Sequence, residues 1–276
     1  MSDALWFDAD AGVWRARDTP AIAYPAGHND ACFRLEDRSF WFNHRNRCIT
    51  AAVARFPPAG PILDVGGGNG YVTRGLIDAG YDAMLLEPGA DGARNARVAR
   101  GVPTVICATL EEAAIRPGSV PAVGLFDVLE HVEDDRAFVE RLHGIVQPGG
   151  LLYLTVPSFQ WLWSISDVDA MHFRRYTRRS LAAVLAGRFE WLYGTYLFER
   201  LVPVFLLMRT LPYRAGLARP KPAEAYQTDH AAGGGRLSVL FERLIANEVR
   251  AVAGGRSLRV GSSLLVVARR LDPVRR

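Results

Sequence analysis

The sequence predicts an α/β fold, and two observations carry that prediction. A short apolar run, Ile62–Val65, is followed by glycines at 66, 68 and 70 and then by a helical pattern, so a buried strand ends in a tight turn that opens a helix. Further along the chain, short apolar runs alternate with helical segments. With 276 residues, 49% of them hydrophobic and 22% charged, the chain suits one domain and excludes disordered and fibrous classes.

The elements follow in chain order. Residues 1–38 show little periodicity and are expected to form an N-terminal extension, before a domain that spans residues 39–276. The expected strands are 62–65, 82–87, 104–107, 122–126, 151–156, 189–196 and 262–270, and the expected helices are 39–56, 71–79, 90–100, one around residues 138–142, 178–186 and 237–251.

Residues 197–261 interrupt this alternation and are expected to form an insertion before the last strand. Its apolar stretch, Leu201–Met208, is broken by Pro203 and flanked by Arg200 and Arg209, which is far short of the roughly 20 residues that span a bilayer. The insertion could form an acceptor lid, a contact between two copies in a homodimer, or an element that lies on a membrane surface.

Charge is unevenly distributed. Residues 1–160 hold 14 Lys and Arg against 20 Asp and Glu, and residues 161–276 hold 19 against 9. The basic second half would attract an anionic partner, such as a small-molecule substrate or a lipid head group. Nucleic acid is a less favoured partner, because no zinc finger or basic-aromatic RNA-binding signature occurs.

The three cysteines show no paired metal-ligand spacing, and the segment Met1–Trp6 does not resemble a secretion signal. We therefore expect a cytoplasmic protein, with peripheral membrane contact as an open alternative.

The glycine turn is more specific than a general nucleotide site. The dinucleotide fingerprint needs a third glycine three residues after the second, but position 71 is Tyr71. Instead the pattern is D-x-G-x-G-x-G, beginning at Asp64. This pattern resembles motif I of the class I S-adenosylmethionine-dependent methyltransferases. The resemblance implies that Asp64, Gly66, Gly68 and Gly70 hold the methionine end of the cofactor. It also implies a doubly wound, Rossmann-like sheet of seven strands with helices on both faces and an antiparallel last strand.

Two further cofactor contacts are expected at the next strands. Glu87 ends the second strand before Pro88-Gly89, where an acid can accept hydrogen bonds from both ribose hydroxyls. By resemblance to the same class, Leu110 lies where members of the class contact the adenine.

The string "DVLEHVEDD" at residues 127–135 is a second match to small-molecule methyltransferases. The resemblance places Phe126 and Asp127 beside the sulfonium and His131 at the mouth of the acceptor pocket, although His131 could instead have a structural role. Resemblance to the ubiquinone-pathway O-methyltransferases also implies an arginine that meets the cofactor carboxylate from the helix before motif I. Arg47 fits that place best and Arg45 second, and a solvated face is the alternative.

A hydroxyl acceptor needs a base that titrates near neutrality, for which His131 and His172 are the candidates for catalysis. His172 lies in a stretch that resembles an "H-x-RRYT" string of bacterial methyltransferases. Arg174, Arg175 and Tyr176 of that stretch could bind the acceptor, or the arginines could form an internal salt network with Asp167.

No metal is expected, because Glu130, His131, Glu133 and Asp134 are nearly consecutive at a helix start and should point in different directions.

The predicted function is methyl transfer from S-adenosyl-L-methionine to a hydroxyl or carboxylate oxygen of an anionic or amphipathic small molecule. Two alternatives remain at this point. One is a nucleotide-cofactor oxidoreductase, and the other is a noncatalytic cofactor-binding or membrane-surface protein.

Overall fold

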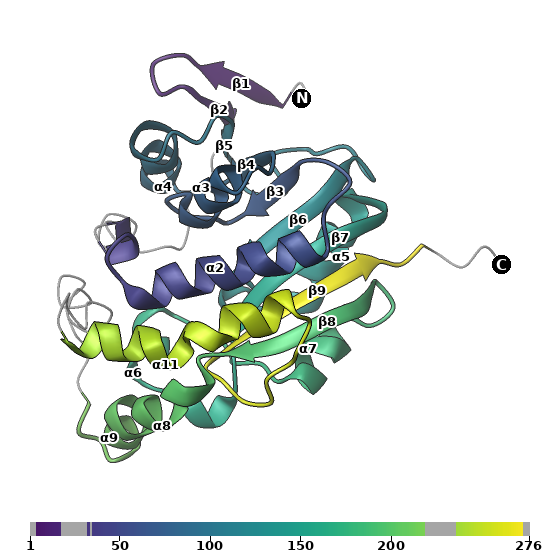
Figure 1. The fold of residues 1–276 in the computed structure, drawn as a ribbon. Helices are drawn as coiled ribbons and strands as arrows, with labels where there is room; N and C mark the ends of the chain where they lie inside the picture. Colours follow the sequence, from purple (N-terminus) through teal and green to yellow (C-terminus); the bar gives the residue numbers. More distant parts are fainter. Residues whose placement is uncertain (1–3, 18–31, 34, 219–235, 273–276) are drawn as a thin grey trace.

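The computed structural model describes residues 4–17, 32–33, 35–218 and 236–272, and in this part of the chain the strands form one nine-stranded sheet (Figure 1). The order across the sheet is β1-β2-β5-β4-β3-β6-β7-β9-β8. The strands are β1 Leu5–Asp8, β2 Val13–Ala16, β3 Ile62–Val65, β4 Ala83–Leu86, β5 Val105–Cys107, β6 Val120–Phe126, β7 Val146–Pro157, β8 Phe189–Leu197 and β9 Ser263–Arg270.

All seven predicted strands are present, and the α/β fold class is confirmed. Strands β5, β4, β3, β6 and β7 are parallel, whereas β9 pairs antiparallel with both β7 and β8, as predicted for the last strand. The N-terminal extension contributes two strands that were not predicted. The β1–β2 hairpin joins the sheet through parallel pairing of Trp14 with Ile106 and of Arg15 with Cys107.

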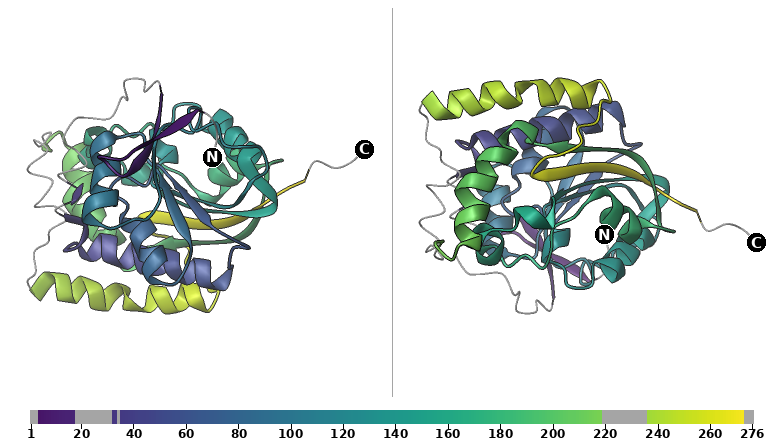
Figure 2. Two further views of the ribbon diagram at one scale, coloured as in Figure 1. Left: turned by 90° about the horizontal axis from the view of Figure 1, so that it is seen from above. Right: turned by 90° about the horizontal axis from the view of Figure 1, so that it is seen from below.

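Helices cover both faces of the sheet (Figure 2). On one face, α2 Phe40–Arg55, α3 Tyr71–Asp78 and α11 Arg236–Ala253 pack on a core that includes Ile49, Leu76 and Val267. On the other face, α5 Asp135–Ile145 and α7 Arg178–Leu185 pack on a core that includes Leu142, Leu181 and Leu152. Helix α4 Ala90–Arg94 continues into the π-helix η1 Asn95–Ala99.

Helix α11 of the insertion lies against α2, side by side in Figure 1, and a buried carboxylate joins both helices to the first residues of the insertion. Glu248 of α11 accepts hydrogen bonds from the backbone N–H groups of Phe198 and Glu199 at 2.8 and 2.9 Å and lies 2.9 Å from His44 Nε2 of α2. This buried contact holds the start of the insertion against the domain, because three polar partners offset the burial of one carboxylate.

The described part of the insertion is helical. It comprises η4 Glu199–Leu201, α8 Val202–Phe205, the π-helix η5 Leu206–Thr210, α9 Leu211–Arg214 and α11, while residues 219–235 of the insertion lie outside the described residues. Among the described residues, no helix is long and apolar enough to cross a membrane.

The sheet topology predicts where a ligand binds. From β3 the chain proceeds to β4 and β5 on one side, and from β6 it proceeds to β7 on the other, so the winding reverses between the neighbouring strands β3 and β6. In open α/β sheets, ligands bind in the crevice outside the carboxyl ends of the strands at such a reversal.

Candidate active site

A cavity of about 290 Å³ lies at the carboxyl ends of β3, β6 and β7. Its wall combines the glycine turn after β3, the loop after β6, helix α2 and the segment around α6, Ile165–Asp169. One cavity therefore contains both the motif expected to hold a cofactor and the histidines expected to meet an acceptor.

The glycine turn forms because its backbone takes conformations that other residues avoid. Gly66 has φ +70°, and a Cβ atom there would lie 2.9 Å from Val128 Cγ2. Gly70, at φ +72°, caps α3 and packs against Ala96 rather than lining the cavity, whereas Gly66 and Gly68 line it. The turn thus presents bare backbone to a ligand.

Asp64 lies beneath this turn and is fully buried. Its Oδ2 atom accepts a hydrogen bond from Thr73 Oγ1 at 2.6 Å, and its Oδ1 atom has no partner among the described residues. Burial raises the pKa of Asp64 to about 6. A carboxylate in that state would gain from a cationic ligand group, such as the ammonium of an amino acid.

Helix α2 directs Arg45, not Arg47, to the cavity. Arg47 is exposed and does not line the cavity, whereas Arg45 is buried, lines it, and lies over the Trp41 ring at 4.6 Å. The Arg45 guanidinium forms an ion pair with Asp127, while its Nε atom has no partner among the described residues. Of the two candidates, Arg45 lines the cavity and Arg47, the preferred one, does not; contact of Arg45 with the cofactor carboxylate stays a prediction.

Phe126 and Asp127 both line the cavity at the end of β6. Asp127 has φ +55°, a conformation that is costly for a residue other than glycine, and its side chain accepts a hydrogen bond from Thr155 Oγ1 at 2.8 Å. Strained residues of this kind concentrate at functional sites.

Glu87 and Leu110 are buried and lie outside the cavity wall. The Glu87 carboxylate accepts hydrogen bonds from the backbone of Gly68 at 2.8 Å and of Gly89 at 2.7 Å, so it holds the glycine turn from behind. Burial raises its pKa to about 7. Contact of Glu87 with a ribose and of Leu110 with an adenine stays a prediction.

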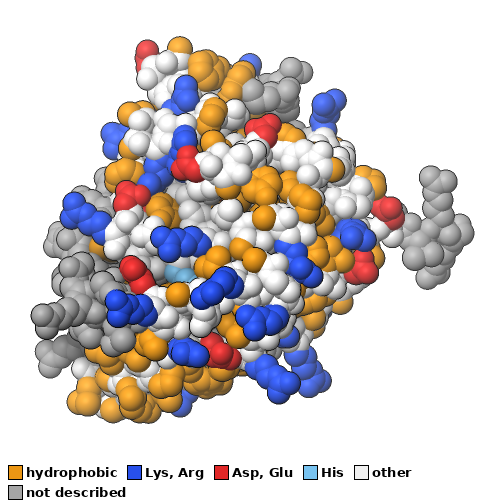
Figure 3. Space-filling view, in the orientation of Figure 1, with side chains coloured by type: hydrophobic (Ala, Val, Ile, Leu, Met, Phe, Trp, Pro, Cys, Tyr) orange, Lys and Arg blue, Asp and Glu red, His pale blue; other side chains and the backbone are white. Residues whose placement is uncertain are grey.

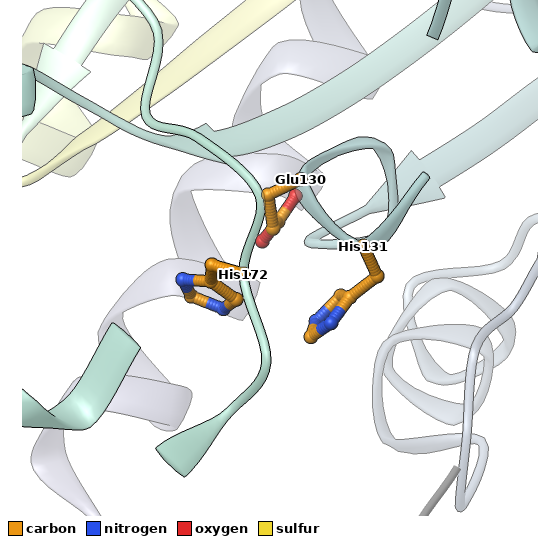
Figure 4. Close-up of side chains that lie close together, drawn as sticks. All are labelled: Glu130, His131 and His172. Carbon is orange, nitrogen blue, oxygen red and sulfur yellow. The ribbon is translucent and has the colours of Figure 1, made fainter. Parts of the chain in front are cut away.

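His131 and His172 lie together in the cavity wall, with their ring centroids 4.8 Å apart (Figure 4). His131 belongs to the short helix η2, Leu129–His131, and His172 follows α6. Ligand atoms of Glu130, His131 and His172 all lie within 4.8 Å of one another. The expectation that no compact cluster of histidine and carboxylate side chains forms is therefore wrong, because the loop with His172 folds against η2.

In the stretch Arg174–Tyr176, one residue lines the cavity and the other two form contacts outside it. Arg175 lines the cavity, but its fork donates to both oxygens of Asp167, from Nε at 2.6 Å and from Nη2 at 2.9 Å. Arg174 forms an ion pair with Asp135 at 3.0 Å, and the buried Tyr176 hydroxyl donates to the same carboxylate at 2.9 Å. Neither Arg174 nor Tyr176 lines the cavity, so the alternative of an internal salt network describes this stretch better than acceptor binding.

Several cavity residues were not predicted from the sequence. Leu35 and Glu36 come from the N-terminal extension, and Phe205, Arg209 and Thr210 come from the insertion. The one available signal was the apolar, arginine-flanked pattern around residues 201–209, which predicts an interaction surface but not its orientation.

The cavity residues fit S-adenosylmethionine. Arg45 and Asp64 both line the cavity and each has one atom without a partner among the described residues, and their charges match the carboxylate and the ammonium of an amino acid end. The glycine backbone between them permits close approach of the ligand.

Comparison with known proteins supports the same fit. A family model described as a methyltransferase domain matches residues 38–188, more than half of the chain. The ubiquinone biosynthesis O-methyltransferase of Xanthomonas campestris pv. campestris (strain B100) is 29% identical over 112 residues, which cover 39% of this chain and 46% of that protein. The tRNA 5-carboxymethoxyuridine methyltransferase of Escherichia coli (strain K12) is 31% identical over 100 residues, which cover 34% of this chain and 38% of that protein. The matches thus span less than half the length of these curated relatives.

Among solved structures, the fold resembles a chain in the complex between the Trm112 methyltransferase activator and a methyltransferase from Haloferax volcanii. The TM-score is 0.56 at 16% identity, and the alignment covers 91% of this chain and 96% of that chain. At this identity the likeness concerns the fold alone.

Proposed function

The chain belongs to the methyltransferase-domain family, and from that premise we propose that it transfers a methyl group from S-adenosylmethionine to an oxygen of a small, anionic or amphipathic molecule. One observation carries the proposal. The glycine turn with its unpartnered Asp64 oxygen and the pair His131 and His172 line the same cavity. The methyl donor and the methyl acceptor would therefore be bound side by side in one cavity.

On the donor side, each residue has a distinct task. Arg45 would bind the cofactor carboxylate, Asp64 would face its ammonium, and Glu87 would anchor the ribose from beneath the turn. When bound, S-adenosylmethionine supplies an activated methyl group and its own leaving group. The chain contributes alignment of the reactants and exclusion of water.

On the acceptor side, the two imidazoles are the groups placed to activate an oxygen. Asp167 Oδ1 lies 2.9 Å from His172 Nδ1, so this contact orients the ring, and Nε2 is the ring nitrogen that Asp167 does not engage. The Asp167 carboxylate is itself held by Arg175, and burial, which alone would raise its pKa, is outweighed by the His172 hydrogen bond and the Arg175 charge, so that the pKa falls to about 2. Asp167 stays ionised and keeps the imidazole oriented.

The insertion supports an amphipathic acceptor. Phe205, Arg209 and Thr210 line the cavity, while Leu207 and Met208 between them are 64% and 73% exposed. Figure 3 shows hydrophobic side chains gathered on this end of the molecule, over α8 and α9. We propose that the insertion covers the acceptor and touches a membrane surface from the cytoplasm, and the alternative of a homodimer contact predicts a dimer in size-exclusion chromatography.

Titration calorimetry and turnover test the proposal together. The folded chain should bind S-adenosylhomocysteine and not NAD, which separates it from an oxidoreductase. It should also label hydroxy acids that carry an apolar tail when supplied with methyl-labelled cofactor. A folded chain that binds no S-adenosylhomocysteine would refute the proposal. Binding without turnover on any such acceptor would favour the noncatalytic alternative.

A further inference from the structure

The wall of the cavity holds a three-residue cluster that the donor side does not use. Glu130 and His131 lie in η2 after β6, and His172 follows α6 (Figure 4). The Phe173 N–H donates to the Glu130 carbonyl at 2.8 Å and so fastens the two segments to each other. The cluster is therefore built by a defined backbone contact between two segments that are distant in sequence.

Glu130 is a buried side chain with no direct ion pair among the described residues, although the charges of Arg45 and Arg175 act on it. Glu130 is 1% exposed, and its Oε2 atom has no hydrogen-bond partner among the described residues. Arg45 and Arg175, whose charges act on Glu130, are each also paired with an aspartate, Arg45 with Asp127 and Arg175 with Asp167. Because burial of a carboxylate without a direct ion-pair partner is unfavourable, this group favours a cation in the cavity.

His172 has the hydrogen bonding that metal-binding histidines commonly have. Asp167 Oδ1 lies 2.9 Å from its Nδ1 atom. A metal-ligating imidazole usually donates its other N–H to a carboxylate or carbonyl, which orients the ring and raises its basicity. Asp167, in turn held by Arg175, gives His172 that arrangement.

We propose that Glu130, His131 and His172 bind one divalent transition-metal ion in the acceptor half of the cavity. The ligand atoms lie within 4.8 Å of one another. Around a common ion with bonds of about 2.1 Å they would lie roughly 3 to 4 Å apart, so each group needs to close by less than about 1 Å. Two imidazoles and one carboxylate favour zinc, iron or manganese over magnesium or calcium, which prefer oxygen ligands.

This site deepens the proposed function and rests on it for its role in catalysis. Three protein ligands leave coordination positions open toward the cavity, where an acceptor hydroxyl can bind. A bound ion would lower the pKa of that hydroxyl, and its proton would pass to solvent water. The oxygen would form a bond to the methyl carbon as the carbon–sulfur bond broke, with the electron pair of that bond returning to sulfur. Acceptors with a second oxygen beside the hydroxyl, such as a vicinal diol or a hydroxy acid, would chelate the ion and be preferred.

Metal titration of the full chain tests the site directly. The chain is freed of metal with a chelator and titrated with Zn²⁺, Mn²⁺ and Mg²⁺ by calorimetry, and with Co²⁺ by visible absorption, which reports imidazole ligation. We expect one equivalent of a transition-metal ion and weaker Mg²⁺ binding. His172→Ala and Glu130→Gln should each weaken binding by more than about 100-fold, because loss of even an outer partner of a ligand costs 10–100-fold.

Matched variants and the cofactor product distinguish the outcomes. His143→Ala on α5 and Glu133→Gln should leave metal affinity unchanged. If the metal-free chain binds S-adenosylhomocysteine but no tested ion stoichiometrically, the metal site is refuted and the methyltransferase proposal stands. If an ion binds but the cofactor product does not, the proposed function fails and the metal site stands. Metal binding that survives a His131→Ala, His172→Ala double variant would also overturn the site.

Discussion

Arg45 provides the sharpest test of the donor site. Its guanidinium is buried, lines the cavity and pairs with Asp127, so replacement by methionine keeps the apolar stem between Trp41 and Phe42 but removes the charge. Removing one partner of a buried, hydrogen-bonded charge pair costs roughly 2–5 kcal/mol of binding free energy. Because Asp127 competes for Arg45 in the free chain, the lower end applies, about 2–3 kcal/mol. Arg45→Met should therefore weaken S-adenosylhomocysteine binding by about 30- to 150-fold.

Two controls isolate the effect in calorimetry. Arg47→Met, two residues away on the same helix and exposed, should leave the affinity unchanged. 5′-Methylthioadenosine lacks the amino acid end, so Arg45→Met should not alter its binding if the fold is intact. The reasoning is refuted if Arg45→Met binds S-adenosylhomocysteine as tightly as the unmodified chain, or if Arg47→Met is the variant that loses affinity.

Four further predictions concern Glu87, Glu248 and the insertion. Since burial raises the pKa of Glu87 to about 7 and ribose hydroxyls donate to its ionised form, affinity for S-adenosylhomocysteine should rise between about pH 6 and 8, and Glu87→Gln should remove that rise in calorimetry. The pKa of Glu87 rises on folding from its ordinary value of 4.5 to about 7, so Glu87 favours the folded state below pH 4.5 and this contribution is lost as the pH rises through about 7. A urea midpoint that stays constant between pH 4.5 and about 7 would contradict this prediction. Glu248→Ala leaves two backbone N–H groups and His44 without their buried partner, so the free energy of unfolding should fall by roughly 3–5 kcal/mol in urea, and a loss below about 1 kcal/mol would show that the contact is dispensable. Replacing Leu207 and Met208 by aspartate should abolish co-flotation with anionic liposomes while S-adenosylhomocysteine still binds, and unchanged flotation would exclude the insertion as the membrane contact.

The donor site was predictable from sequence because backbone geometry dictates its residues. The turn at Gly66 requires a positive φ and leaves no room for a Cβ atom beside Val128, so glycine suits it best. The glycine pattern can therefore be recognised in the sequence without a structure. The β1–β2 hairpin was not predictable for the opposite reason. Its pairing with β5 joins segments about 90 residues apart, and the sequence of an edge strand does not indicate which strand it pairs with.

The position of Arg45 on the buried face could have been predicted from the periodicity of α2. The buried positions of this helix include His44, Cys48, Ile49 and Ala52, so Arg45 lies four residues before Ile49 on the buried face. Arg47 lies two residues further, about 200° around the helix axis, and faces solvent. Matching by distance to Asp64 favoured Arg47, whereas the helical period places Arg45 on the buried face that lines the cavity.

The acceptor side could not be predicted in the same way, because its chemistry depends on which side chains are already paired with another side chain. Arg175 lines the cavity as proposed for an acceptor-binding arginine, yet its fork is bound to Asp167. Asp167 in turn orients His172, and the loop with His172 is held against Glu130 and His131 by the Phe173 N–H, which donates to the Glu130 carbonyl, and by Arg174, which donates to the Glu133 carbonyl. The pairing of Arg175 with Asp167 lies within one segment and was one of the two alternatives drawn from the sequence, whereas the contact of His172 with Glu130 and His131 joins distant segments and had no local signal. If this chain of contacts positions the reacting oxygen, Arg175→Lys should lower turnover without weakening S-adenosylhomocysteine binding, because a single ammonium cannot replace the two-pronged hold on Asp167. An equal loss of both would instead assign Arg175 to the donor half of the cavity.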